Sequence, residues 1–161
     1  MLEKYPDFKQ FAIVRHNYAQ ALSTRKDGIA EARRLWSLNV DEANYIPSRI
    51  SIANDLLSQE DRLGAIDQYR AIVLAEPDGV SPRLRLAELL EASGNTDDAL
   101  AQIREASRQA PESVLILERM GDLQALARDV AQARSAYESA TSFSTDLKVR
   151  MRLAAKIGRL P

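Results

Sequence analysis

The sequence contains no cysteine and a single histidine, His16. These absences exclude disulfides, thiolate catalysis, cysteine-ligated metals and a histidine pair for zinc. A nucleophilic triad would have to use His16, and no neighbouring residue is spaced to support that role. We therefore expect no enzyme activity, no cofactor and no metal site, and we interpret His16 as a surface or groove residue.

Glycine and proline are also scarce. The six glycines are isolated, so no phosphate-binding loop is present in the sequence. No run approaches the ~18–20 apolar residues of a membrane span, and residues 1–10 lack the apolar core of a signal peptide. We expect a soluble, cytoplasmic, all-α chain, unless the sequence was excised from a longer protein that carried a targeting segment.

Charge is nearly balanced along the chain. The formal net charge is −1, and 45% of the residues are hydrophobic, which is enough for an apolar core. Such a balance gives no electrostatic drive toward nucleic acid or an anionic membrane. Most carboxylates fall in expected first turns of helices or beside a basic residue three or four positions away, which is ordinary helix-surface chemistry.

Residues 80–113 contain two apolar-periodic runs joined by a turn, which predicts a pair of helices. We expect the first helix at residues 81–92, with Ser81 as N-cap and Pro82 at the first helical position. Its buried face would contain Leu86, Ala87 and Leu90.

The second helix of this pair follows a turn at Gly94. Thr96 is its expected N-cap, and Pro111 ends it. Its buried face would contain Ala99, Ile103 and Ala106. Because a lone helical hairpin cannot bury its apolar face, this pair needs neighbouring pairs.

The same pattern recurs along the chain with a period of 34 residues. Small residues occupy one position at every step: Ala19, Ala53, Ala87, Gly121 and Ala155. The preceding position is apolar at every step: Tyr18, Ile52, Leu86, Met120 and Ala154. Second-helix positions repeat as well: Ala65, Tyr69 and Ile72, then Ala133, Tyr137 and Ala140. Several independent positions obey one spacing, so chance is a poor explanation.

The repeated motif of Leu86-Ala87, Leu90, Gly94, Ala99, Ile103, Ala106 and Pro111 resembles the tetratricopeptide repeat (TPR) family. The resemblance implies an all-α, right-handed solenoid of antiparallel helix pairs. It predicts a single array with a degenerate first repeat at 1–45, repeats at 46–79, 80–113 and 114–147, and a C-terminal capping helix at 148–161. Residues 46–147 match well, and the motif is specific for the fold but nearly silent on function.

The first repeat fits the period least well. In its second helix, expected at about residues 29–38, Ala32 and Trp36 come one residue late. Either the turn at residues 26–28 carries an insertion, or Leu35 and Leu38 fill these positions instead. We interpret Trp36 as a packing residue rather than a ligand platform.

The last expected helix, at about residues 145–160, is basic on the side away from its apolar residues. Five basic side chains are involved: Lys148, Arg150, Arg152, Lys156 and Arg159. We interpret this side as a solvated face that caps the open end of the array. The alternative is a patch for an acidic partner or an anionic surface.

The resemblance implies that the first helix of each pair lines a concave groove. The candidate groove residues, placed by the period, are Asn17, Gln20, Ser51, Asn54, Arg85, Glu88, Arg119 and Asp122. Asparagine and arginine at regular spacing can hold an extended peptide through its backbone and a carboxylate. The structural alternative is that Arg85–Glu88 and Arg119–Asp122 are ion pairs on a solvated surface.

We therefore predict a non-enzymatic scaffold that binds a protein or peptide segment in this groove, as part of a larger assembly. The carboxylate clamp of chaperone-binding TPR proteins is incomplete, because Asn54 and Arg119 match it but Ile50, Arg85 and Leu115 do not. The alternatives are a small TPR-type chaperone for a secreted or assembled client, and the TPR segment of a larger protein. RNA binding, as in pentatricopeptide repeats, is disfavoured by the slightly acidic charge.

Overall fold

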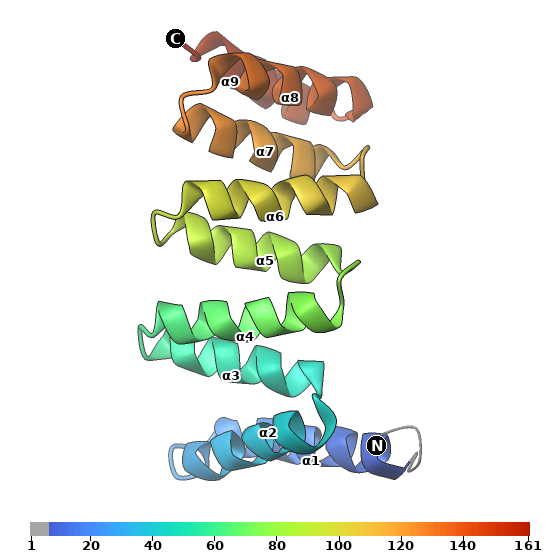
Figure 1. Ribbon diagram of the computed structural model, residues 1–161, viewed down its shortest axis with the longest axis vertical. Helices are drawn as coiled ribbons and strands as arrows, with labels where there is room; N and C mark the ends of the chain where they lie inside the picture. Colours follow the sequence, from blue (N-terminus) through green and yellow to red (C-terminus); the bar gives the residue numbers. More distant parts are fainter. Residues whose placement is uncertain (1–6) are drawn as a thin grey trace. The chain divides into compact units, whose positions relative to one another are not determined.

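The computed structural model describes the backbone from residue 7 and side chains from residue 10, through to residue 161. This part of the chain forms nine α-helices and no strand (Figure 1). The predicted all-α helical-repeat class is therefore confirmed, while the first six residues of the predicted first repeat lie outside the described residues. The chain divides into two compact units, residues 1–72 and 73–161, with the boundary inside α4.

The first unit contains α1 (Asp7–Ser23), α2 (Ile29–Ala43), α3 (Ile46–Ser58) and most of α4 (Arg62–Ala75). Helices α1 and α2 pack together through Ala19, Ala32, Leu35 and Trp36. Helices α3 and α4 are linked by a hydrogen bond from Arg49 Nη1 to Gln68 Oε1 of 3.2 Å. The predicted packing role of Trp36 is correct, since its side chain is only 3% exposed.

The structure settles the register of α2. Ala32, Trp36 and Asn39 are buried, with the same spacing of four and three as Ala65, Tyr69 and Ile72 in α4. Leu38 is only partly buried. The turn before α2 therefore carries one extra residue relative to the period, as the first of the two alternatives proposed.

Helix α2 also runs past the predicted end at Leu38, to Ala43. The apolar pattern stops at this point because Asn39 fills an interior position. Its Nδ2 donates to the Ala12 carbonyl and to Ser48 Oγ, both at 3.0 Å, and these bonds satisfy the amide nitrogen away from water. A periodicity count that recognises only apolar residues therefore ends the helix early.

The second unit contains α5 (Val80–Glu91), α6 (Thr96–Gln109), α7 (Val114–Leu126), α8 (Val130–Phe143) and α9 (Leu147–Gly158). The predicted buried residues of α5 and α6 are all at most 2% exposed. Gly94 adopts the left-handed backbone expected of the turn between these helices, with φ of 79°.

Two predicted helix caps are wrong. The N-cap of α5 is Gly79 and that of α6 is Asn95, so Ser81 and Thr96 lie within the helices and Pro82 follows the first helical position. Neither N-cap residue makes a side-chain capping bond, which shows that the turns themselves set these helix starts. Side-chain caps occur instead before the last two helices, at Asp129 and Asp146.

The periodic series also fails at both ends of the chain. Tyr18 is 58% exposed, because no helix of the first unit covers that side of α1. Ala154 and Ala155 are exposed, since no second helix follows α9 within residues 159–161. Burial at these positions therefore depends on a neighbouring helix, and the sequence series predicts only where such a helix would fit.

Small residues allow the paired helices to approach closely. At Gly121 in α7, an added Cβ would lie 2.5 Å from Cε1 of Tyr137 in α8. Ala19, Ala53 and Ala87 hold the equivalent positions and are at most 2% exposed. The contact between the two helices of a pair therefore tolerates only a residue without bulk at this step.

Two Gly-to-Ala substitutions should change stability in opposite directions. Gly121→Ala forces the Tyr137 ring to move and should lower the free energy of unfolding by about 1–3 kcal/mol. Gly158→Ala in α9 meets no atom within 4 Å and should be neutral or raise stability by up to about 1 kcal/mol. Urea denaturation of both variants checks the sign, and equal effects would contradict the proposed close approach.

Candidate partner-binding surface

The eight candidate groove residues lie on α1, α3, α5 and α7, the first helices of their pairs. Asn17, Gln20 and Asn54 are exposed in the first unit, whereas Ser51 is 6% exposed. In the second unit Arg85 is exposed, and Glu88, Arg119 and Asp122 are partly buried. The two units differ in the chemistry that they present.

The surface of the first unit is neutral at its centre. Gln20 Nε2 on α1 donates to Ser51 Oγ on α3, at 3.2 Å. Asn17 and Asn54 have no side-chain hydrogen-bond partner among the described residues. A cavity of about 260 Å³ opens here, lined by Gln20, Ser23, Ile29, Trp36, Ser51, Asn54 and Asp55. We name Asn17, Gln20, Ser51 and Asn54 the amide surface.

A buried polar network, which the sequence interpretation missed, lies between α1, α2 and α3. Ser48 Oγ accepts a hydrogen bond from Asn39, and it lies 3.1 Å from Nδ1 of His16. Both Asn39 and Ser48 are fully buried. The His16 ring also packs edge-on against Tyr45, with centroids 5.6 Å apart. Through Ser48, His16 of α1 is therefore linked to both α2 and α3. The one signal for this network in the sequence was Asn39, a polar residue at a position where the other repeats have an apolar one.

The protonation of His16 follows from this position. Desolvation lowers its pKa below the ordinary value of 6.5. A neutral ring can accept the Ser48 hydroxyl proton at Nδ1, since Ser48 Oγ already accepts from Asn39. The structure thus favours uncharged His16 at neutral pH.

In the second unit the candidate residues pair with one another. Arg85 Nη1 lies 2.9 Å from Glu88 Oε2, as the structural alternative predicted. Arg119 Nη2 lies 3.5 Å from Glu88 Oε1, so it reaches from α7 to α5 rather than along α7 to Asp122. Glu88 is thus shared by two arginines on successive first helices.

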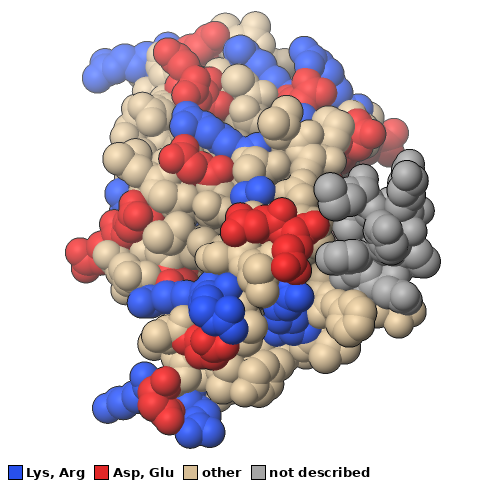
Figure 2. Space-filling model, turned by 60° about the horizontal axis from the view of Figure 1, so that its bottom comes forward, with Lys and Arg blue, Asp and Glu red and all other residues tan. Residues whose placement is uncertain are grey.

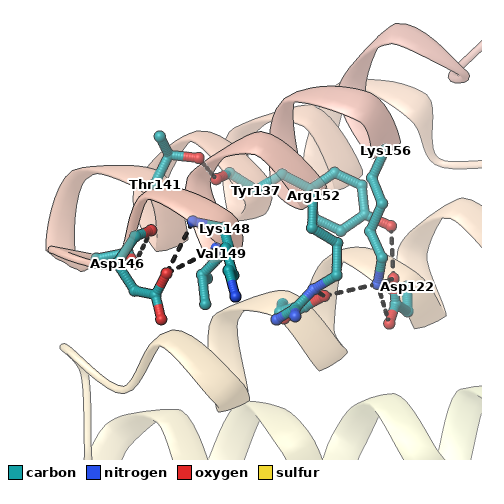
Figure 3. Close-up of polar contacts among 10 residues, drawn as sticks. Asp122, Tyr137, Thr141, Asp146, Lys148, Val149, Arg152 and Lys156 are labelled. Atoms are coloured by element: carbon teal, nitrogen blue, oxygen red, sulfur yellow. Dashed lines mark hydrogen bonds and ion pairs between the residues drawn. The ribbon is translucent and has the colours of Figure 1, made fainter.

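Asp122 instead binds Lys156 of α9 (Figure 3). Glu118, four residues earlier on α7, binds Arg152 and Lys156. Arg152 donates two hydrogen bonds to Glu118, of 2.9 and 2.7 Å. Lys156 Nζ lies 2.6 Å from Asp122 Oδ1 and 2.9 Å from Glu118 Oε1. Tyr137 also donates to Asp122 Oδ1, at 2.8 Å. We name these five residues the α7–α9 cluster.

The α7–α9 cluster corrects the prediction of a wholly solvated basic face on the last helix. Arg152 and Lys156 turn toward α7, while Lys148, Arg150 and Arg159 are exposed. The sequence does contain a signal for this cluster, since residues of opposite charge are separated by one period. Glu118 and Arg152 are 34 residues apart, as are Asp122 and Lys156.

The electrostatics of the cluster support its structural role. The hydrogen bond from Arg152 holds the pKa of Glu118 below its ordinary value, although the carboxylate is only 8% exposed. Burial, followed by the hydrogen bond to Asp122, raises the pKa of Tyr137. Glu118 is therefore ionised and Tyr137 neutral over the physiological pH range, which matches the pairs that they form.

Both signs of charge occur on the face of the molecule shown in Figure 2. On the face shown in Figure 2, acidic and basic side chains are interleaved with uncharged ones. Within residues 7–161, no helix is long and apolar enough to cross a membrane. The described side chains also contain no group of three or more His, Asp or Glu arranged to hold a metal ion.

Stacked antiparallel helix pairs with small residues at a fixed step define an α-helical repeat protein. The chain belongs to the tetratricopeptide repeat-like family, because the model of the tetratricopeptide repeat-like domain matches residues 16–161. This confirms the family predicted from the 34-residue period. The fold is that of a protein-interaction scaffold, and the match indicates no catalytic class.

Solved structures of the same fold are similar at low sequence identity. MamA from Desulfovibrio magneticus RS-1 has a TM-score of 0.71 at 17% identity, covering 92% of this chain and 84% of that chain. The Yersinia enterocolitica type III secretion chaperone SycD, in complex with a peptide of the translocator YopD, has 0.65 at 12% identity, covering 74% and 94%. The Sgt2 TPR domain from Aspergillus fumigatus has 0.60 at 20% identity, covering 71% and 77%. No curated protein matches the sequence.

Acidification should weaken the fold through His16. The pKa of His16 is lower in the folded chain than in the unfolded chain, so the unfolded chain is protonated first as the pH falls. The stability that neutral His16 contributes is therefore complete above pH 6.5 and is lost as the pH falls below 6.5. We expect the free energy of unfolding to fall between about pH 7 and about pH 5, and His16→Gln to reduce that dependence. Denaturation at several pH values measures both. If the stability of the wild type and of His16→Gln falls in parallel with pH, His16 is not held in its neutral form by the folded chain.

Proposed function

We propose that this chain is a non-enzymatic scaffold that binds a peptide segment or helix along its first helices, within a larger assembly. The observation that carries the proposal is the amide surface of the first unit. Asn17 and Asn54 are exposed and unpaired among the described residues, and Asn54 lines a cavity of about 260 Å³ together with Gln20 and Ser51. An extended peptide presents a donor and an acceptor at each residue, and neutral amides can satisfy both.

The first helices of the second unit carry charges that are already paired. Its candidate residues Arg85, Glu88 and Arg119 already neutralise one another. A charged partner would have to compete with these pairs, and exposed pairs are individually weak. We therefore propose that the amide surface of the first unit, rather than α5 and α7, recognises an uncharged backbone segment of the partner.

A second candidate is a chaperone for a secreted or assembled client. The similarity to SycD, which was solved with a peptide of its translocator, motivates this candidate at the level of the fold. The test is whether the purified chain keeps an aggregation-prone client in solution at equimolar ratio. A scaffold without chaperone activity would leave the aggregation rate unchanged.

The amide surface can be tested by comparative affinity capture. The wild-type chain and an Asn17→Ala/Asn54→Ala variant would be used as baits, with quantitative identification of the proteins that differ. For the partner peptide so found, calorimetry should show affinity weakened roughly tenfold or more, because two hydrogen bonds are lost. An Arg85→Ala/Arg119→Ala variant should weaken it less.

The matched control is Arg104→Ala/Glu138→Ala, which removes two exposed side chains from the second helices α6 and α8. It should bind as the wild type does. If the control and the amide variant lose the same proteins, the assignment to the first helices is wrong.

A further inference from the structure

Helix α9 takes the place of a first helix although no second helix follows it within residues 159–161. Its contacts with α7 join residues one period apart, Arg152 to Glu118 and Lys156 to Asp122. On its inner side, Leu153 is fully buried against Leu117, Ala133, Tyr137 and Ala140. The orientation of α9 is therefore fixed, and so is the side that it turns outward.

The outer side of α9 is an apolar stripe at helical spacing, formed by Leu147, Met151, Ala154, Ala155 and Gly158. Leu147 is 70% exposed and Met151 is 65% exposed. Two periods earlier, Ala154, Ala155 and Gly158 correspond to three residues of α5 that are 2% exposed: Leu86, Ala87 and Leu90. The stripe is thus the surface on which a first helix receives its second helix.

The stripe has the shape to receive a helix. Its central residues are Ala154, Ala155 and Gly158, and an added Cβ at Gly158 would meet nothing within 4 Å. In the neighbouring pair, the small residue Gly121 is what lets Tyr137 of α8 approach α7. A helix with a small residue, a large apolar residue four positions later and a small residue three further on would fit, as Ala133, Tyr137 and Ala140 do.

The charges beside the stripe decide between possible occupants. By helical spacing, Lys148 and Arg159 flank it on one side and Arg150 flanks it on the other. All three are exposed and have no ion-pair partner among the described residues. A second copy of α9 would bring like charges together, which opposes self-association through this stripe.

We propose that the outer stripe of α9 is a docking surface for an acidic amphipathic helix of a partner protein. Its apolar face covers Met151 and the small residues, and its carboxylates meet Lys148, Arg150 and Arg159. This surface is separate from the amide surface, because α9 belongs to the second unit and the amide surface belongs to the first.

The probe is a synthetic peptide with the sequence of residues 95–109, which carries the packing face of α6, with the substitution Arg104→Glu. Asp98 and Glu105 then flank one side of that face and the new glutamate flanks the other. The matched peptide has Asp98→Asn, Glu105→Gln and Arg104→Gln. Fluorescence anisotropy with the whole 161-residue chain should show binding of the acidic peptide at least roughly tenfold tighter than the neutral one, with the difference shrinking at high salt.

Variants of the chain locate the binding. Met151→Glu and, separately, Lys148→Glu/Arg150→Glu/Arg159→Glu should each weaken the acidic peptide at least roughly tenfold. The charge-matched control Lys26→Glu/Arg104→Glu/Arg134→Glu changes exposed basic residues elsewhere and should have no effect beyond a uniform salt-dependent loss. Circular dichroism checks that each variant is folded, and Leu147→Gln serves if Met151→Glu is not.

The proposal would be overturned by equal binding of the two peptides, by no binding of either, or by a concentration-dependent dimer in sedimentation equilibrium that Met151→Glu abolishes. The last would assign the stripe to a second copy of this chain. The proposal would also be overturned if Asn17→Ala/Asn54→Ala abolished binding of the acidic peptide and Met151→Glu did not, since the peptide would then be held at the amide surface. Failure of this test leaves the proposed function of the first unit unaffected.

Discussion

The fold depends on close approach between the two helices of each pair. An amphipathic hairpin exposes more apolar surface than it covers, so it is stable only if its helices pack tightly and a neighbouring helix covers the rest. Gly121 against Tyr137 shows how little room remains, with an added Cβ reaching 2.5 Å from the ring. The same step holds alanine in α1, α3 and α5. This steric requirement explains why a small residue recurs at one step of the 34-residue period.

A second set of contacts links successive first helices. Gln20 bonds to Ser51 in the first unit, and Arg119 reaches Glu88 in the second. The strongest member is Glu118, whose buried carboxylate receives both Arg152 and Lys156. In the second unit, therefore, much of the charge on the first helices is used to hold helices together. In the first unit, neutral amides remain exposed.

This difference explains why the sequence predicted the fold better than the site. Ala87, Ile103 and their counterparts obey simple periodicity, so helix pairing and most buried positions followed from spacing alone. The buried Asn39 interrupted that periodicity, because an amide whose Nδ2 donates two hydrogen bonds can replace an aliphatic side chain in the interior, although its Oδ1 has no hydrogen-bond partner among the described residues. The register of α2 could therefore be settled only by the structure.

The candidate site depended on partners that are distant in the sequence. Arg119 has carboxylates three residues away on α7 and on the preceding first helix, and only the three-dimensional arrangement shows that it reaches Glu88. The burial of Ala155 likewise depends on whether a second helix is present, not on the residue itself. Periodicity thus identifies which side of a helix receives a neighbour, but not whether that neighbour exists.

The central claim is that charged residues of the first helices in the second unit stabilise the fold. A double-mutant cycle of Glu118→Gln and Arg152→Gln, followed by urea denaturation, measures it most directly. We predict a coupling energy clearly above the error of the measurement, since Glu118 is buried and the contact is bidentate. The same cycle on the exposed pair Arg25 and Asp27 should give a smaller coupling energy. A coupling near zero for Glu118 and Arg152 would contradict the claim, because these charges would then be free for a partner.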